Sequence, residues 1–183
     1  MPTSRTRLSI TTLALAGLAG AVSLAVSPGA ATADPGTHDR DGAGRAVAEL
    51  RRTVAPYRDV AAALADGFVP TDQCASSPAG GMGLHYVNPA RLQASADPAN
   101  PQILLYGKAA DGSVELLAAE FFAPDRDQDL RTDGDRPSLF GQPFDGPMPG
   151  HGTDMPVHYD LHVWVEKANP AGVFSPWNPN VSC

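Results

Sequence analysis

The segment HGTDMPVHYDLHVWVEK, from His151 to Lys167, holds three of the five histidines of this 183-residue sequence. Histidine binds transition metals and titrates near neutral pH, so a cluster of histidines can serve metal binding or acid–base chemistry. His158, Asp160 and His162 occupy alternate positions within the segment. The segment is therefore the first candidate for a functional site.

The same segment has the alternation of a β-strand. From Val157 to Glu166, apolar side chains occupy every second position, and the positions between them are mostly polar. A period of two is typical of a half-buried antiparallel strand. We expect the apolar face to lie toward a helix and the polar face to lie toward water or a pocket.

Strand geometry limits which residues can share one metal ion. His158 and His162 are about 13 Å apart along a regular strand, so they would barely reach one ion with bonds of about 2 Å unless a bulge shortens the distance. Asp160 is only about 6.6 Å from either histidine, so it can pair with one of them. A third ligand must come from another strand, such as His85 in GLHYVNP or Glu120 in AAEFF. The sequence thus predicts one divalent transition metal, with His85, Glu120, His158, Asp160 and His162 as candidate ligands.

Acid–base chemistry without a metal is the second interpretation. Asp160 could orient His158 or His162, as a carboxylate orients the base of a catalytic triad. The sequence contains no G-x-S-x-G nucleophile motif. This interpretation predicts a small extracellular hydrolase or lyase with those three residues as its catalytic candidates.

Two further interpretations involve no catalysis. In one, Tyr86, Tyr106 and Trp164 offer aromatic surfaces to a small polar ligand beside the histidines. In the other, the chain is a purely structural secreted domain whose histidines make ordinary hydrogen bonds. We expect such a structural role for His151, which lies among prolines and glycines.

The first 33 residues have the pattern of a secretory signal peptide. Arg5 and Arg7 precede an apolar run from Leu8 to Val26, and the small-residue motif ATA closes the segment. Cleavage would leave a flexible stretch at residues 34–44 and a single domain at residues 45–183, and would place the protein outside the cell. An uncleaved membrane anchor is the alternative, because the apolar run is about long enough to span a bilayer.

The net charge restricts the classes of partner, and the cysteine content bears on the compartment in which the protein works. Loss of the two arginines changes the formal net charge from −7 to −9, since −7 − 2 = −9. An acidic surface argues against nucleic acid and anionic membranes as partners and is compatible with a small molecule or a metal ion. Cys74 and Cys183 are the only cysteines. In an oxidising compartment they are expected to form one disulfide.

The remaining patterns indicate which elements position these residues. Helical spacing runs from Arg45 to Gly67 and is interrupted by Pro56. β-type patterns follow near residues 68–70, 83–89, 101–108 and 113–124, before the strand at 157–166. Residues 125–155 show no periodicity, but Phe140 and Phe144 indicate that residues 138–156 pack onto the domain.

The predicted fold is α+β. An N-terminal helical segment packs on an antiparallel sheet of about four or five strands, and a long loop rich in Pro and Gly precedes the last strand. The stretches MGLHYVNP, PSLFGQPFDGPMPGH, MPVHYDLHVW and NPAGVFSPWNPNVSC together resemble a group of secreted bacterial proteins to which no activity is attached. This resemblance implies a secreted single domain and supplies no mechanism.

Overall fold

The computed structural model describes residues 35–109, 111–152 and 154–183. The predicted signal peptide, residues 1–33, lies outside these residues. The described chain begins with helix α1 (Pro35–Val54), which continues into the 3-10 turn η1 (Ala55–Arg58) and helix α2 (Val60–Ala65). Helix α1 thus includes residues 35–44, which the sequence predicted as a flexible stretch. Proline at a first helical position is favourable, and the helix accommodates Gly42 and Gly44 at a modest cost in propensity.

Local side chains define the ends of the second helix. Pro56 lies in η1 and separates the two α-helices, as its position in the sequence indicated. The Asp59 side chain caps α2 by accepting a hydrogen bond from the Ala61 amide at 2.9 Å. Gly67 follows the helix with a φ of +87°, the left-handed conformation in which glycine commonly ends a helix. In the described part of the chain, no helix combines the length and apolar character needed to cross a membrane.

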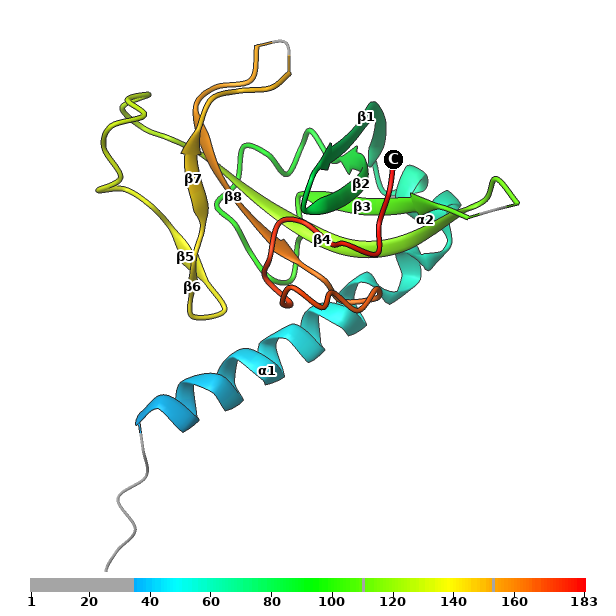
Figure 1. Ribbon diagram of the computed structural model, residues 1–183, viewed down its shortest axis with the longest axis horizontal. Helices are drawn as coiled ribbons and strands as arrows, with labels where there is room; N and C mark the ends of the chain where they lie inside the picture. Colours follow the sequence, from blue (N-terminus) through cyan, green and yellow to red (C-terminus); the bar gives the residue numbers. More distant parts are fainter. Residues whose placement is uncertain (1–34, 110, 153) are drawn as a thin grey trace, which may run out of the picture. The chain divides into compact units, whose positions relative to one another are not determined.

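An antiparallel sheet of six strands, in the order β1-β2-β3-β4-β8-β7, follows the helices (Figure 1). Its strands are β1 (Val69–Ser77), β2 (Gly80–Val87), β3 (Ile103–Lys108), β4 (Val114–Pro124), β7 (Asp145–Met148) and β8 (His158–Val163). The α+β class with an antiparallel sheet is confirmed, whereas the predicted four or five strands were too few. A hairpin joins β3 to β4, and a bulge opposite Leu105 and Tyr106 shifts its register.

The additional strand lies in the segment that the sequence predicted as a loop. β7 pairs with β8 at Asp145 and Met148, and a separate two-stranded ribbon, β5 (Ser138–Leu139) with β6 (Gln142–Pro143), precedes it. These short strands could not be recognised in the sequence, because their prolines and glycines do not contribute to an alternating pattern of polar and apolar residues. Proline is tolerated at a sheet edge, where an amide donor is not required. Phe140 and Phe144 are buried in the core, which agrees with a segment packed onto the domain.

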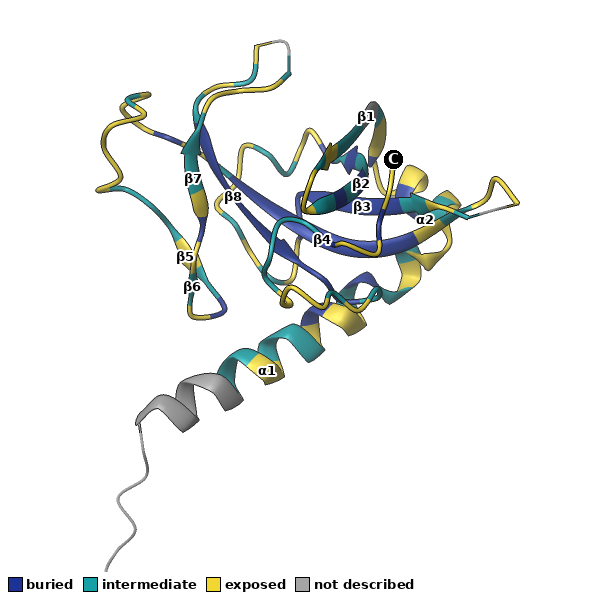
Figure 2. Cartoon of the chain, viewed as in Figure 1, coloured by how far each residue is buried: buried dark blue, intermediate teal, exposed yellow. Residues whose placement is uncertain are grey.

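The sheet carries a core on each face, so β8 is buried throughout and β3 and β4 are buried along most of their lengths (Figure 2). The helix-side core contains Leu50 and Val54 of α1 together with Tyr159, Leu161 and Val163 of β8. A smaller core lies on the opposite face and includes Val181 of the C-terminal tail, so we call it the tail-side core. Its buried members are Ile103, Leu105, Leu117, Ala118, Phe122, Trp164 and Val181. The polar side chains of β8 face this second side.

Candidate metal centre

Strand β8 presents its polar side chains on one face, as the alternation predicted. His158, Asp160 and His162 alternate with Tyr159 and Leu161, which belong to the helix-side core. All three polar side chains are also buried, with His162 fully inaccessible and Asp160 only 4% exposed. Buried ionisable groups require partners, because removing them from water is costly. The polar face of β8 therefore needs charged or coordinating groups nearby.

Two other strands supply these groups. Glu120 of β4 pairs directly with His162 of β8 in the antiparallel register. His85 of β2 lies one strand further, separated from Glu120 by β3 and thus by about 9.5 Å of sheet. The histidine and glutamate side chains are long enough to meet across β3. His85, Glu120 and His162 consequently converge on the tail-side face of the sheet.

The three side chains approach one another closely. His85 Nε2 lies 3.3 Å from Glu120 Oε2, and His162 Nε2 lies 3.7 Å from the same oxygen. One ligand atom from each residue falls within 4.8 Å of those of the other two. The cluster combines two imidazoles and a carboxylate, the donor set of several metal centres in proteins.

Several buried polar atoms of Glu120, Asp160 and His162 lack ordinary hydrogen bonds. Within the described part of the chain, no hydrogen-bond partner is found for Glu120 Oε2, Asp160 Oδ1 or either ring nitrogen of His162. Asp160 Oδ1 is 3.6 Å from His162 Nδ1, beyond hydrogen-bond range. Buried polar atoms without partners are rare in native proteins and often indicate an ion or ligand. Their concentration around one point is the strongest feature of this site.

Electrostatics at the cluster favours the charged forms. Burial alone would raise the pKa of Glu120, but the nearby charges of His162 and His85 outweigh burial and lower it to about 2. Burial alone would lower the pKa of His162, but the Glu120 and Asp160 carboxylates raise it to about 9. Without a metal, His162 therefore holds a proton between two buried carboxylates at neutral pH.

Asp145 of β7 adds a third carboxyl group beside the cluster. It pairs with Asp160 across the β7–β8 ladder. Burial first, and then the charge of Asp160, raises the pKa of Asp145. The β7 strand, which the sequence did not predict, thus brings an acidic side chain to the site.

His158 takes a different position from His162. Its Nδ1 lies 3.0 Å from the Pro156 carbonyl oxygen, and its ring stacks on Phe122 at a centroid distance of 5.1 Å. Burial lowers the pKa of His158, so the ring is neutral at pH 7 and Nδ1 donates to the carbonyl. His158 is not among the three converging residues. This placement agrees with the strand-spacing argument that separated it from His162.

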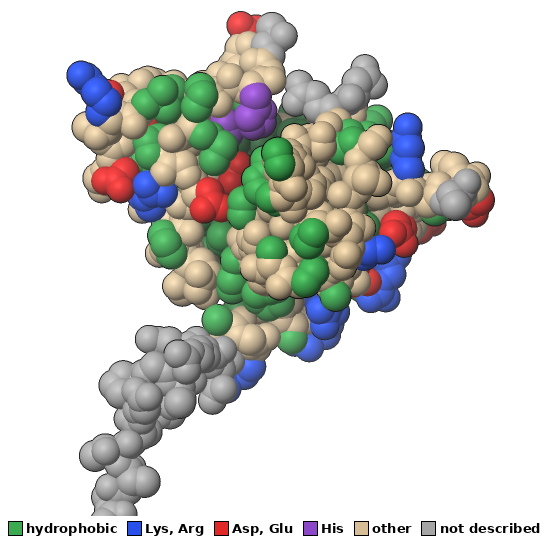
Figure 3. Space-filling model, viewed as in Figure 1, with side chains coloured by type: hydrophobic (Ala, Val, Ile, Leu, Met, Phe, Trp, Pro, Cys, Tyr) green, Lys and Arg blue, Asp and Glu red, His purple; other side chains and the backbone are tan. Residues whose placement is uncertain are grey.

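Two cavities meet at the cluster. The first is about 630 Å³ and the second is about 510 Å³, and His85, Glu120 and His151 line both. In Figure 3 the surface is hollowed near histidine and acidic side chains. His151 was predicted as a structural residue, yet it is exposed at this cavity wall and its ring lies 5.2 Å from that of His158. No local pattern in its Pro- and Gly-rich stretch could have revealed this position.

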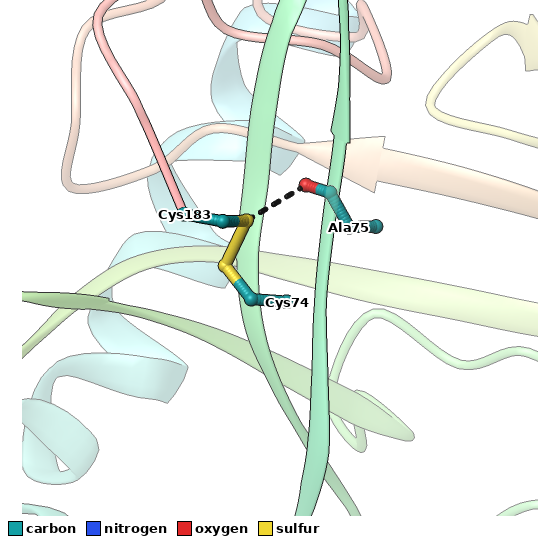
Figure 4. Close-up of a disulfide and its surroundings, with 3 residues drawn as sticks. All are labelled: Cys74, Ala75 and Cys183. Carbon is teal, nitrogen blue, oxygen red and sulfur yellow. Dashed lines mark hydrogen bonds between the residues drawn. A yellow bond between two sulfur atoms is a disulfide. The ribbon is translucent and has the colours of Figure 1, made fainter.

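The C-terminal tail forms part of the wall of the second cavity. Pro176 and Trp177 line it, and Gly81 and Asn178 exchange backbone hydrogen bonds of 3.1 and 3.0 Å. The predicted disulfide between Cys74 and Cys183 ties the tail to β1, with the Cys183 sulfur 3.2 Å from the Ala75 carbonyl oxygen (Figure 4). Cys74 also lines the second cavity. The disulfide therefore lies beside the site as well as at the chain terminus.

The aromatic residues predicted to bind a ligand lie elsewhere. Tyr86 and Tyr106 belong to the helix-side core, with their ring centroids 4.5 Å apart. Adjacent residues of a strand face opposite sides, so Tyr86 points away from the face that His85 occupies. Trp164 is buried on the tail side, where its indole nitrogen donates to the Ser175 carbonyl at 2.7 Å. None of the three lines either cavity, whereas Trp177 does.

Comparison with protein-family models, with curated proteins and with solved structures finds no match to this chain. The interpretation of the site therefore depends on its own geometry and chemistry.

Proposed function

We propose that the protein binds one divalent transition metal through His85, Glu120 and His162. The observation that carries this proposal is the convergence of one ligand atom from each residue within 4.8 Å. Two histidines and one glutamate form the protein ligands of some catalytic zinc sites, and two histidines with a carboxylate hold iron(II) in many oxygenases. Zinc and iron(II) are thus the first metals to test.

The spacing of the cluster supports this proposal. Around a tetrahedral ion with bonds of 2.0–2.1 Å, neighbouring ligand atoms lie about 3.4 Å apart. The separations from Glu120 Oε2 are 3.3 Å to His85 Nε2 and 3.7 Å to His162 Nε2. Two of the three separations between ligand atoms therefore suit such an ion already, and all three lie within 4.8 Å. The ion would also coordinate Glu120 Oε2 and His162 Nε2, two of the buried atoms that have no hydrogen-bond partner.

Asp160 has a position suited to supporting such an ion. It lies beside Nδ1 of His162, whereas Glu120 lies beside Nε2 of the same ring. A metal bound at Nε2 would leave the ring proton on Nδ1, facing the Asp160 carboxylate. Metal-bound histidines commonly donate their other ring proton to a carboxylate, which fixes the ring and strengthens the ligand. Asp160 is accordingly assigned an orienting role.

A secreted location is the second part of the proposal. The Cys74–Cys183 disulfide supports it, because such bonds persist mainly in oxidising compartments. The N-terminal pattern of two arginines, an apolar run and a small-residue motif supports it independently. The metal would therefore be acquired during export or outside the cell.

Elemental analysis tests metal binding directly. The full-length chain is expressed without an affinity tag, and the secreted product is purified, stripped with a chelator and reloaded with zinc. We expect about one zinc per chain in the wild type and close to none in His85→Ala and His162→Ala.

His158→Gln is the matched control for this measurement. It changes a buried histidine on the same strand but outside the converging triad, so it should retain zinc. Equal zinc content in all four proteins would place the metal elsewhere. A wild type that stays metal-free after reloading would reject the metal proposal and leave a structural domain or a metal-free acid–base site.

Metal affinity is expected to depend on pH with a defined sign. Because the pKa of His162 is raised to about 9 by Glu120 and Asp160, zinc must displace a proton from the ring at neutral pH. Glu120, whose pKa is lowered, is already ionised and releases none. Affinity should thus fall about tenfold for each pH unit between pH 8 and pH 7. Calorimetry in buffers of different ionisation enthalpy counts the released protons. If the affinity for zinc did not change between pH 8 and pH 7, the assignment of His162 as a ligand would be contradicted.

A further inference from the structure

The cavities around the cluster give access to the proposed metal from two sides. His85 and Glu120 line both the 630 Å³ cavity and the 510 Å³ cavity. A metal held by two histidines and one glutamate has at least one coordination position left, as in catalytic zinc sites. Asp160 does not belong to the converging triad. The open position would then face space large enough for a small organic molecule.

The walls of this space are largely apolar. The first cavity is lined by Val87, Leu92, Ile103, Phe122 and Met155, among others. The second has Met82, Met148 and Trp177 in its wall, together with Asp145 and Asp160. Among the described residues that line the two cavities, none is a lysine or an arginine. A phosphate or sulfate group would therefore find carboxylates rather than positive side chains beside the metal.

We propose that the metal takes an external ligand that donates oxygen atoms and carries an apolar substituent. The carboxylate, enolate and hydroxamate groups fit, because each has at most a single negative charge that the metal neutralises. The apolar substituent occupies the first cavity, against Leu92 and Phe122. This inference rests on the metal site proposed above and identifies the class of molecule that the site receives.

Cobalt(II) makes the inference measurable, because its visible spectrum responds to changes in coordination. The protein is loaded with cobalt and titrated separately with acetohydroxamate, benzohydroxamate and inorganic phosphate. Both hydroxamates should change the spectrum, and benzohydroxamate should bind about tenfold more tightly because its ring removes apolar area from water. Phosphate at the same concentrations should leave the spectrum unchanged.

A pair of leucine variants locates the apolar subsite. Leu92→Ser alters the wall of the first cavity and should reduce the preference for benzohydroxamate at least threefold, with acetohydroxamate affinity retained. Leu130→Ser is the matched control, since Leu130 is 49% exposed and lines neither cavity. Its preference should equal that of the wild type.

The outcomes separate this inference from the metal proposal. A protein that binds no cobalt would reject the metal site and with it the ligand. A protein that binds cobalt but shows no spectral change with either hydroxamate has a saturated metal, which overturns the inference alone. Equal affinities for the two hydroxamates, or tighter binding of phosphate, would overturn the apolar ligand class.

Discussion

Removal of the Cys74–Cys183 disulfide is expected to lower the free energy of unfolding by about 4–5 kcal/mol. The bond joins residues 109 positions apart, and closing a loop of about 100 residues restricts the unfolded chain by about this amount. Urea unfolding of the wild type and of a Cys74→Ser/Cys183→Ser double variant measures the difference. The unfolded double variant is also less compact, so its transition should depend more steeply on urea.

Other contacts of the C-terminal tail keep it in place when the disulfide is removed. Asn178 is fully buried and Val181 belongs to the tail-side core, so these contacts hold the tail even without the disulfide. Ser182→Ala, at the exposed residue beside Cys183, is the control and should change stability by less than about 0.5 kcal/mol. If the double variant fails to be secreted, reduction of the folded wild type by a phosphine provides the same comparison. A loss below about 1 kcal/mol would show that the unfolded chain gains little freedom when the bond is removed.

Short-range patterns in the sequence predicted the elements that hold most of the site. Alternation from Val157 to Val165 identified strand β8 and the shared face of its polar residues. Strand spacing also separated His158 from His162, since the rise per residue is a property of every strand. The two-cysteine content predicted the disulfide that the structure contains. These features depend on neighbouring residues or on composition and require no knowledge of strand order.

Long-range pairing accounts for what the sequence could not supply. His85 meets Glu120 only because β2, β3 and β4 are consecutive in the sheet, and Trp177 reaches the second cavity through the tail's pairing with Gly81. A bulge in the β1–β2 ladder near Gly83 also disturbs the alternation before His85. Gly83 has a φ of +101°, and a Cβ there would approach the Tyr106 carbonyl oxygen to 2.7 Å. Such requirements come from strands far apart in sequence.

Tyr86 shows how the period of two could have been used further. Once His85 is assigned to the site face, the next residue must face the other side of the sheet. Tyr86 indeed packs against Tyr106 in the helix-side core. Aromatic character alone was a poor guide, because large aromatic side chains are also the usual material of a core. In the structure, Trp177 lines the second cavity, whereas Tyr86, Tyr106 and Trp164 do not.

Zinc is expected to stabilise the folded protein by about 4 kcal/mol when its free concentration is 1,000 times the dissociation constant. For proteins of about 150–250 residues, each kcal/mol raises the melting temperature by about 2–4 °C, so the expected increase is about 8–16 °C. The stabilisation arises because the unfolded chain does not hold His85, Glu120 and His162 together. Calorimetric melting with and without zinc measures the increase.

A pair of glutamate variants on strand β4 tests whether this stabilisation comes from the proposed centre. Glu120→Gln keeps the side-chain volume but removes the charged ligand, so zinc should no longer raise the melting temperature appreciably. Glu115→Gln makes the same chemical change at an exposed position of the same strand, 3.5 Å from the Lys167 ammonium group, and should retain the full increase. An equal increase in both variants would mean that zinc acts at another site. Loss of the increase in Glu120→Gln alone would show that the stabilising zinc requires the buried carboxylate that contacts both His85 and His162.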